Sequence, residues 1–94
     1  MLHAAALASL KIALTPALRG EGRHQIARAV LLAETPADWR AVARMDRWGG
    51  VAPIADLVAE GDLAGAADVL ARTDEYAAAR VRRILVTSSA QVSA

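Results

Sequence analysis

The side chains that could perform chemistry are few in this 94-residue chain, and their spacing is not that of a catalytic or metal site. His3 and His24 lie in different predicted elements, and neither stands at metal-ligand spacing from a carboxylate. A zinc or di-iron site needs three or four converging ligands, and helix motifs such as HExxH are absent. Because the sequence contains no cysteine, thiolate nucleophiles, thiolate metal sites and disulfides are excluded. We therefore expect no bound metal and no cofactor.

The remaining nucleophiles, glycines and acids also lack a catalytic context. The glycine groups Gly20-Glu21-Gly22 and Gly49-Gly50 do not have the offsets of a phosphate-binding loop. Paired acids such as Asp74-Glu75 stand where helices are expected to begin, and capping explains them there. No strand-turn-helix pattern surrounds the serines, which are Ser9, Ser88, Ser89 and Ser93. The sequence predicts a protein that is not an enzyme.

Arginine is the functional side chain that the sequence places at regular helical spacing. Arg40, Arg44 and Arg47 follow i, i+4, i+7 spacing and therefore share one face of a helix predicted over residues 36–48. Guanidinium groups could not all pack into a core, so this row must face water, an acidic surface or a phosphate backbone. Arginine donates two parallel hydrogen bonds equally well to carboxylates and to phosphates.

A second arginine row is predicted near the end of the chain, where Arg80 and Arg83 share a face and Arg82 is offset. Both rows allow three interpretations: a face that is solvated or paired with the acids of residues 51–79, a nucleic-acid backbone site, or a site for an acidic protein surface. The pI of about 8.4 is modest for a nucleic-acid-binding protein. We expect a protein partner or self-association, with a nucleic-acid backbone as the alternative and no small-molecule substrate.

The two tryptophans differ in what their positions predict. Both Trp39 and Trp48 suit a core, but Trp48 precedes Gly49-Gly50 at a predicted helix end. That position makes Trp48 the better candidate for an exposed interface anchor, because tryptophan is enriched at binding hot spots. The predicted partner-binding residues are Arg40, Arg44, Arg47, Trp48, Arg80 and Arg83.

Composition indicates how these residues are positioned. The chain is 55% hydrophobic with 3% aromatic residues and no Phe, so alanine, leucine and valine supply most of the bulk. Alanine has the highest helix propensity, which favours an all-α domain. The net charge is only +1 but unevenly spread. Residues 1–50 carry seven basic and four acidic groups, residues 51–79 one and six, and residues 80–94 three and none.

Hydrophobic periodicity and the helix start and stop residues predict one domain over residues 1–87. We expect a compact bundle of five or six short helices, orthogonal or up-down, followed by a flexible polar tail over residues 88–94. Gly61 and Asp62 separate two of these helices, and Thr73-Asp74-Glu75 begins the last one. The predicted helices cover residues 1–19 with a kink or end at Pro16, 23–34, 36–48, 53–60, 62–70 and 75–87.

The helix over residues 36–48 has the clearest predicted ends. Thr35 suits the N-cap, Pro36 the first helical position, and Asp38 the positive end of the helix dipole. Gly49-Gly50 predicts a left-handed C-terminal stop. The face opposite the arginines carries Trp39, Val42 and Met45.

The first nineteen residues admit several interpretations. A secretory signal lacks its basic start, and Lys11 and Pro16 interrupt a membrane span. An amphipathic organellar transit peptide fits the absence of acids but has few basic residues. We favour a core helix and a cytoplasmic protein, because a leucine stripe follows helical spacing at Leu7, Leu10, Leu14 and Leu18.

Residues 57–67 resemble the hairpin of a tetratricopeptide unit. In that family a Gly-Asp pair, here Gly61-Asp62, links two helices, and a small residue, here Ala66, follows four positions after the Asp. The family's bulky aromatic is missing from the first helix, and no second copy is visible. The same hairpin spacing occurs in helix-turn-helix proteins, but residues 62–68 offer acids and small apolar groups where base-contacting donors are needed.

Overall fold

The computed structural model describes the backbone of residues 3–93 and the side chains of residues 3–87. Within these residues the chain forms helices and no strand, which confirms the predicted all-α class. The helices are α1 (Ala4–Gly20), α2 (His24–Leu32), α3 (Pro36–Met45), α4 (Val51–Ala59), α5 (Leu63–Leu70) and α6 (Glu75–Ser93).

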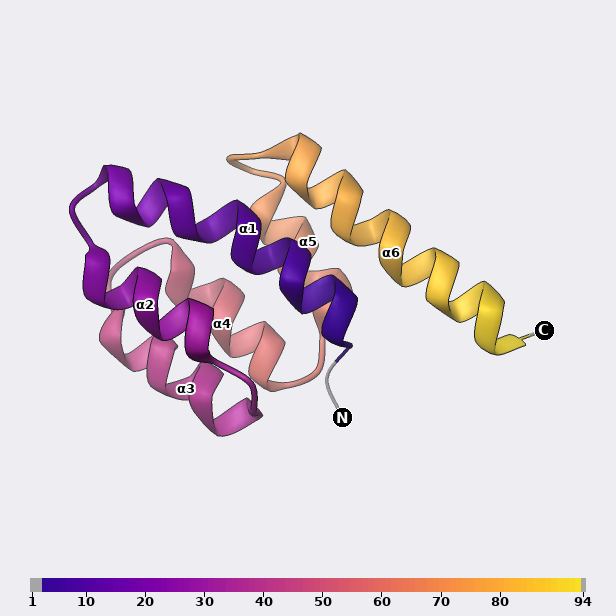
Figure 1. The fold of residues 1–94 in the computed structure, drawn as a ribbon, viewed down its shortest axis with the longest axis horizontal. Coiled ribbons are helices and arrows are strands. Elements are labelled where there is room, and N and C mark those ends of the chain that lie inside the picture. Colours follow the sequence, from indigo (N-terminus) through magenta and orange to yellow (C-terminus); the bar gives the residue numbers. More distant parts are fainter. Residues whose placement is uncertain (1–2, 94) are drawn as a thin grey trace.

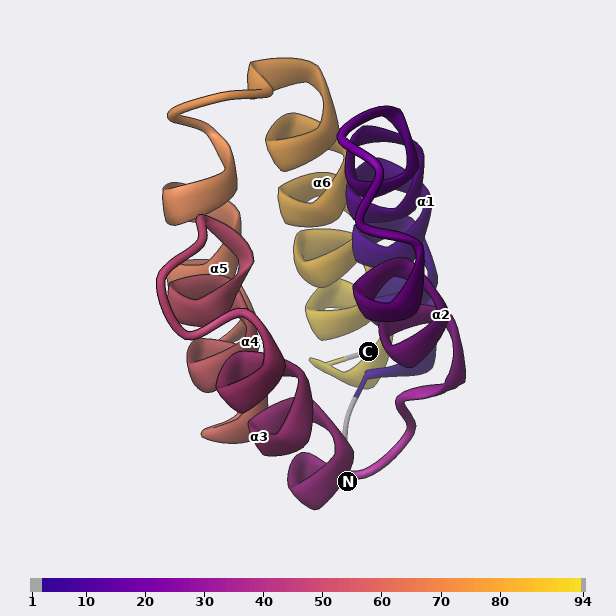
Figure 2. The same cartoon turned by 90° about the vertical axis from the view of Figure 1, so that its left-hand side faces the viewer.

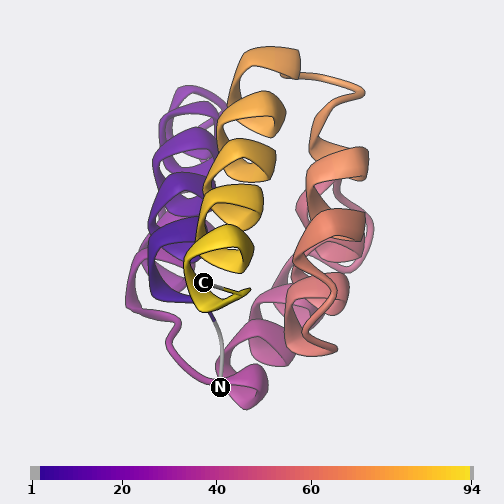
Figure 3. The same cartoon turned by 90° about the vertical axis from the view of Figure 1, so that its right-hand side faces the viewer.

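The helices form a closed ring (Figure 1). Each helix packs against the next one along the chain, and α6 returns to pack against α1. In the two side views α1 and α2 lie on one side, α3, α4 and α5 lie on the other, and α6 runs beside α1 (Figures 2 and 3). The second half of α6 extends past the other helices in Figure 1. This arrangement places the α1–α2 turn near the α3–α4 turn.

The interior is made mainly of alanine, leucine and valine, as the composition predicts. Trp39 is fully buried and is the largest side chain in the core. All four leucines of the predicted α1 stripe are buried, so residues 4–20 are a core helix of the bundle. No helix within the described residues is long and apolar enough to cross a membrane. Pro16 lies inside α1, which continues to Gly20 rather than ending at the proline.

Several helix ends are set by side chains within three residues, as predicted. The Thr35 hydroxyl accepts from the Asp38 N–H at 3.2 Å, and the Asp38 carboxylate accepts in return from the Thr35 N–H at 3.0 Å. Asp62 caps α5 by accepting from the Gly65 N–H at 2.8 Å, after Gly61 turns the chain with a positive φ. Asp74 begins α6 in the same way. These cap bonds satisfy donors that the first helical turn leaves free, and at Thr35 and Asp38 they are reciprocal.

The predicted glycine stop of α3 is wrong. The helix ends at Met45 rather than 48, and neither Gly49 nor Gly50 has a positive φ. Asp46 ends the helix instead, and its carboxylate bonds to the start of the next helix. As a result α4 begins at Val51, two residues before the predicted Pro53.

Other boundaries and orientations also differ from the sequence prediction. Helix α2 is shorter than the predicted 23–34, whereas α6 continues to Ser93 instead of ending at 87. The predicted tail is therefore helical over 88–93, and residue 94 lies outside the described residues. The sequence predicts Met45 opposite the arginines beside Trp39 and Val42, yet Met45 is the last residue of α3 and is 47% exposed, whereas the other two are buried.

The Thr35 cap can be tested by removing its acceptor. Thr35→Ala leaves the Asp38 N–H without its partner at the start of α3, and we expect a loss of about 0.5–2 kcal/mol in the free energy of unfolding. Urea denaturation measures this loss. Thr87→Ala, in an exposed position within α6, is the matched control and should change stability little. An unchanged stability in Thr35→Ala would mean that this cap contributes nothing.

The same cap gives a pH dependence. The N–H groups of Glu34 and Thr35 both donate to Asp38, at 2.9 and 3.0 Å, and these bonds lower the pKa of its carboxyl. A pKa that is lower in the folded state stabilises the fold above the unfolded value, 3.8, and this contribution is lost as pH falls through the folded pKa. We expect the stability difference between wild type and Asp38→Asn to shrink below that pH in urea titrations. A stability difference that does not change with pH would contradict this contribution of the Asp38 carboxylate.

Candidate functional site

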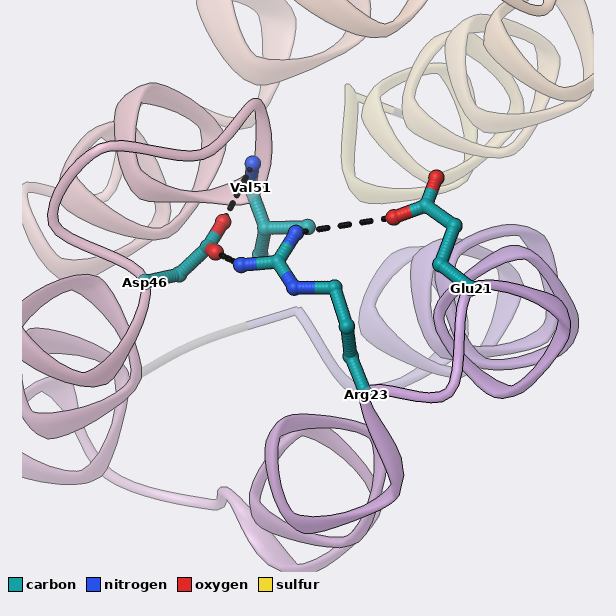
Figure 4. Close-up of polar contacts among 4 residues, drawn as sticks. All are labelled: Glu21, Arg23, Asp46 and Val51. Atoms are coloured by element: carbon teal, nitrogen blue, oxygen red, sulfur yellow. Dashed lines mark hydrogen bonds and ion pairs between the residues drawn. The ribbon is translucent and has the colours of Figure 1, made fainter.

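A buried ion pair joins two turns that lie far apart in the sequence. Asp46 is 1% exposed, and the Arg23 guanidinium from the turn between α1 and α2 contacts its Oδ1 (Figure 4). Its Oδ2 accepts from the Val51 N–H at 2.8 Å. Glu21 lies 3.6 Å from the other side of the same guanidinium. Because both carboxylate oxygens are engaged, the charge of Asp46 is compensated inside the protein.

This carboxylate fixes the five-residue connection between α3 and α4. It stands at the C-terminal end of α3 and caps the N-terminal end of α4, so residues 46–51 form a closed loop. Gly49 packs directly against it, and a Cβ at Gly49 would collide with the Asp46 carboxylate. The glycine is required here for space, not for a left-handed backbone.

Trp48 protrudes from this fixed loop. It is 91% exposed, whereas Trp39, nine residues earlier, is completely buried. The Arg47 guanidinium lies over the Trp48 ring, 5.3 Å from its centroid, which is within the range of a cation–π interaction. The sequence places both tryptophans in the core, which is right for Trp39 and wrong for Trp48; the choice of Trp48 as the better candidate for exposure is confirmed. A large aromatic side chain on a fixed loop can serve as an anchor for a partner.

The first arginine row borders a hollow between α3 and α4. All three of its arginines are exposed, and Ala43 and Ala52 form an apolar floor. The hollow has a volume of about 420 Å³, and Asp56 of α4 is the acidic residue in its lining. We call this surface the arginine hollow; it is lined by Arg40, Ala43, Arg44, Arg47, Ala52 and Asp56. No carboxylate among the described residues forms an ion pair with its arginines.

The second arginine row is placed elsewhere. Arg80 and Arg83 are exposed on α6, and α6 packs against α1 and α5 rather than against α3. Arg82 forms an ion pair with Asp68 of α5, so the predicted pairing with acids of residues 51–79 occurs at this offset position. Arg80 lines a separate groove with the exposed Tyr76. The structure brings together the first row and Trp48 but not the second row.

The rest of the described structure shows no cluster that could act as a metal centre. No group of three histidines or acids stands close enough to hold an ion among these residues. His3 caps α1, where its Nδ1 accepts from the Ala6 N–H at 3.2 Å, and His24 is exposed at the start of α2. The absence of enzymatic activity and of a cofactor remain predictions from the sequence.

Sequence reasoning missed the buried pair between Arg23 and Asp46. One signal was available: Asp46 follows the last turn of α3, where the negative end of the helix dipole disfavours an acid. An acid in that position needs a compensating donor. The identity of the donor, 23 residues earlier in the chain, could not be read from local spacing.

The comparisons with known proteins give no family assignment. No protein-family model matches the chain, and no similar curated protein or solved structure was found. The resemblance of residues 57–67 to a tetratricopeptide hairpin is therefore limited to the α4–α5 connection, where Gly61 and Asp62 form the turn and cap described above. Function must be argued from the surface itself.

The close packing of Gly49 against Asp46 gives a direct test of the loop. Gly49→Ala places a methyl group against the buried carboxylate, and we expect it to lower the free energy of unfolding by about 1–3 kcal/mol. Gly50→Ala is the matched control, because a Cβ there meets no atom within 4 Å. Thermal and urea unfolding of the two variants check this. Equal stability of both variants would contradict the packing described for residue 49.

Proposed function

We propose that this protein is a non-catalytic subunit that binds another protein through the α3–α4 loop and the adjoining arginine hollow. The observation that carries the proposal is Trp48, which is 91% exposed on a loop held by a buried ion pair. Contact between an exposed indole ring and water is unfavourable, so covering the ring with a partner contributes favourably to the free energy of binding. A cytoplasmic location is part of the proposal and rests on the sequence; residues 4–20 belong to the core of the fold.

Self-association and binding of a different protein are both forms of this proposal, and solution measurements separate them. Sedimentation velocity over a range of protein concentrations detects self-association. A nucleic-acid backbone is the alternative partner, favoured only by the three unpaired arginines of the hollow. Phosphate binding would give a steep dependence of affinity on salt concentration.

Trp48→Ala tests the proposal. Wild type, Trp48→Ala and Tyr76→Ala serve as immobilised baits in nuclease-treated extract of the source cells, and captured proteins are quantified by mass spectrometry. Tyr76 is the matched control, because it is 93% exposed on α6, at a different surface. We expect wild type and Tyr76→Ala to capture one or more proteins in near-stoichiometric amount. Trp48→Ala should capture about tenfold less of the same proteins.

Two results would contradict the proposal. If all three baits capture the same proteins in the same amounts, the α3–α4 loop is not the interface. If wild type captures proteins from untreated extract but not from nuclease-treated extract, the bound species is nucleic acid or is bridged by it. Circular dichroism of each bait establishes that the variants are folded, which the exposure of both aromatic side chains leads us to expect.

A further inference from the structure

Six of the ten acidic side chains of this protein form a hydrogen bond or ion pair within the chain, whereas most arginines form no ion pair in the part of the chain that the structure describes. Glu21 pairs with Arg23, and five aspartates bond to backbone N–H groups or to an arginine: Asp38, Asp46, Asp62, Asp68 and Asp74. Among the described residues, which include every arginine of the chain, only Arg23 and Arg82 form ion pairs. The net charge of +1 therefore conceals a surface with many uncompensated cations.

The arginine hollow concentrates three of these cations: Arg40 and Arg44 on α3, and Arg47 in the turn that follows it. Successive residues of an α-helix rise 1.5 Å, so the positions of Arg40 and Arg44 are separated by about 6 Å along α3. Arg47 rests one face of its guanidinium on Trp48, which leaves its N–H edge free to donate. The guanidinium groups of Arg40 and Arg44 therefore match carboxylates at i and i+4 of another helix, which are also about 6 Å apart along its axis.

The floor of the hollow adds a second requirement. Ala43 and Ala52 are only 8% and 9% exposed, so their methyl groups form an apolar bottom between the charged rims. The Trp48 ring provides a further apolar surface beside Arg47. A ligand that fills about 420 Å³ here needs both carboxylates for the rim and an apolar side chain for the floor.

A nucleic-acid backbone meets these requirements less well. Asp56 lines the hollow and repels a phosphate and a carboxylate alike, so the apolar floor and the number of arginines decide between the two ligands. Tight duplex binding commonly uses six to ten phosphate contacts, and the hollow offers three arginines. The second row, on α6, lies on a helix that does not pack against α3 and does not extend the hollow.

We propose that the arginine hollow binds an acidic amphipathic helix of a partner protein. Carboxylates at i and i+4 of that helix accept from Arg40 and Arg44, and an apolar side chain between them lies on Ala43 and Ala52. Arg47 and Trp48 contact the end of the helix. This inference rests on the proposed function and adds the chemical class of the partner segment.

Direct binding of synthetic ligands tests the inference. The probe is a helical peptide of about 16 residues with glutamates at i, i+4 and i+8 and leucines beside them. A second peptide carries glutamine in place of every glutamate, and a random-sequence DNA duplex is the third ligand. Protection of Trp48 from acrylamide quenching and isothermal titration calorimetry report binding, because Trp48 is the exposed tryptophan and Trp39 is shielded.

We expect the glutamate peptide to bind and to protect Trp48. The glutamine peptide should bind with an affinity at least about tenfold lower. The double variant Arg40→Gln/Arg44→Gln should weaken the glutamate peptide about tenfold, while Arg80→Gln/Arg83→Gln, which removes the same charge from α6, should change its affinity less than about twofold. All four arginines are exposed, so both variants should remain folded.

Other outcomes overturn the inference and are distinguishable from failure of the proposed function. No peptide binding at about 1 mM, or equal losses in both double variants, would show that the hollow is not selective for acidic helices. Tighter binding of the duplex than of the peptide would assign the hollow to nucleic acid. If the peptide fails while extract proteins are still captured in a Trp48-dependent manner, the interaction function stands and only the acidic-helix inference falls.

Discussion

The surface described above depends on a single buried carboxylate. Asp46 accepts from the Val51 N–H with one oxygen and pairs with Arg23 through the other, so it joins the end of α3, the start of α4 and the α1–α2 turn. Breaking a buried pair from one side leaves the remaining charge or donor uncompensated, at a cost of about 3–5 kcal/mol in other proteins. Within a small domain that amount is a large part of the total stability.

The sequence predicts the features that depend on near neighbours. Residue type and position predict caps at Thr35, at Asp62 and within Thr73-Asp74-Glu75. In the structure Thr35, Asp62 and Asp74 each accept from a backbone N–H three residues further on. The arginine row and the exposed Trp48 also follow from helical spacing and from position. The same local logic misreads Gly49-Gly50, where a glycine pair after a helix predicts a left-handed stop. Gly49 instead makes room for the Asp46 carboxylate, whose ion-pair partner is Arg23.

Distribution of charge shows the same limit of sequence reasoning. The acids of residues 51–79 form a plausible internal complement for the arginines, and one pair of this kind exists, between Arg82 and Asp68. The others are placed by the fold: Asp62 and Asp74 cap helices, and Asp56 lines the hollow without an ion pair. An acid that caps a helix is not available to neutralise an arginine. Only the folded arrangement therefore shows that Arg40 and Arg44 form no ion pair with any described residue.

Rigidity of the α3–α4 loop connects the buried pair to binding. A side chain that must be ordered on association loses conformational entropy, about 0.5–1.5 kcal/mol for each rotamer-rich residue. Here the backbone on both sides of Trp48 is held, by Asp46 before it and by the capped start of α4 after it. The contact between the Arg47 guanidinium and the Trp48 ring further restricts the conformations of both side chains. The pair between Arg23 and the buried Asp46 thus reduces the ordering cost at the exposed residues that a partner would contact.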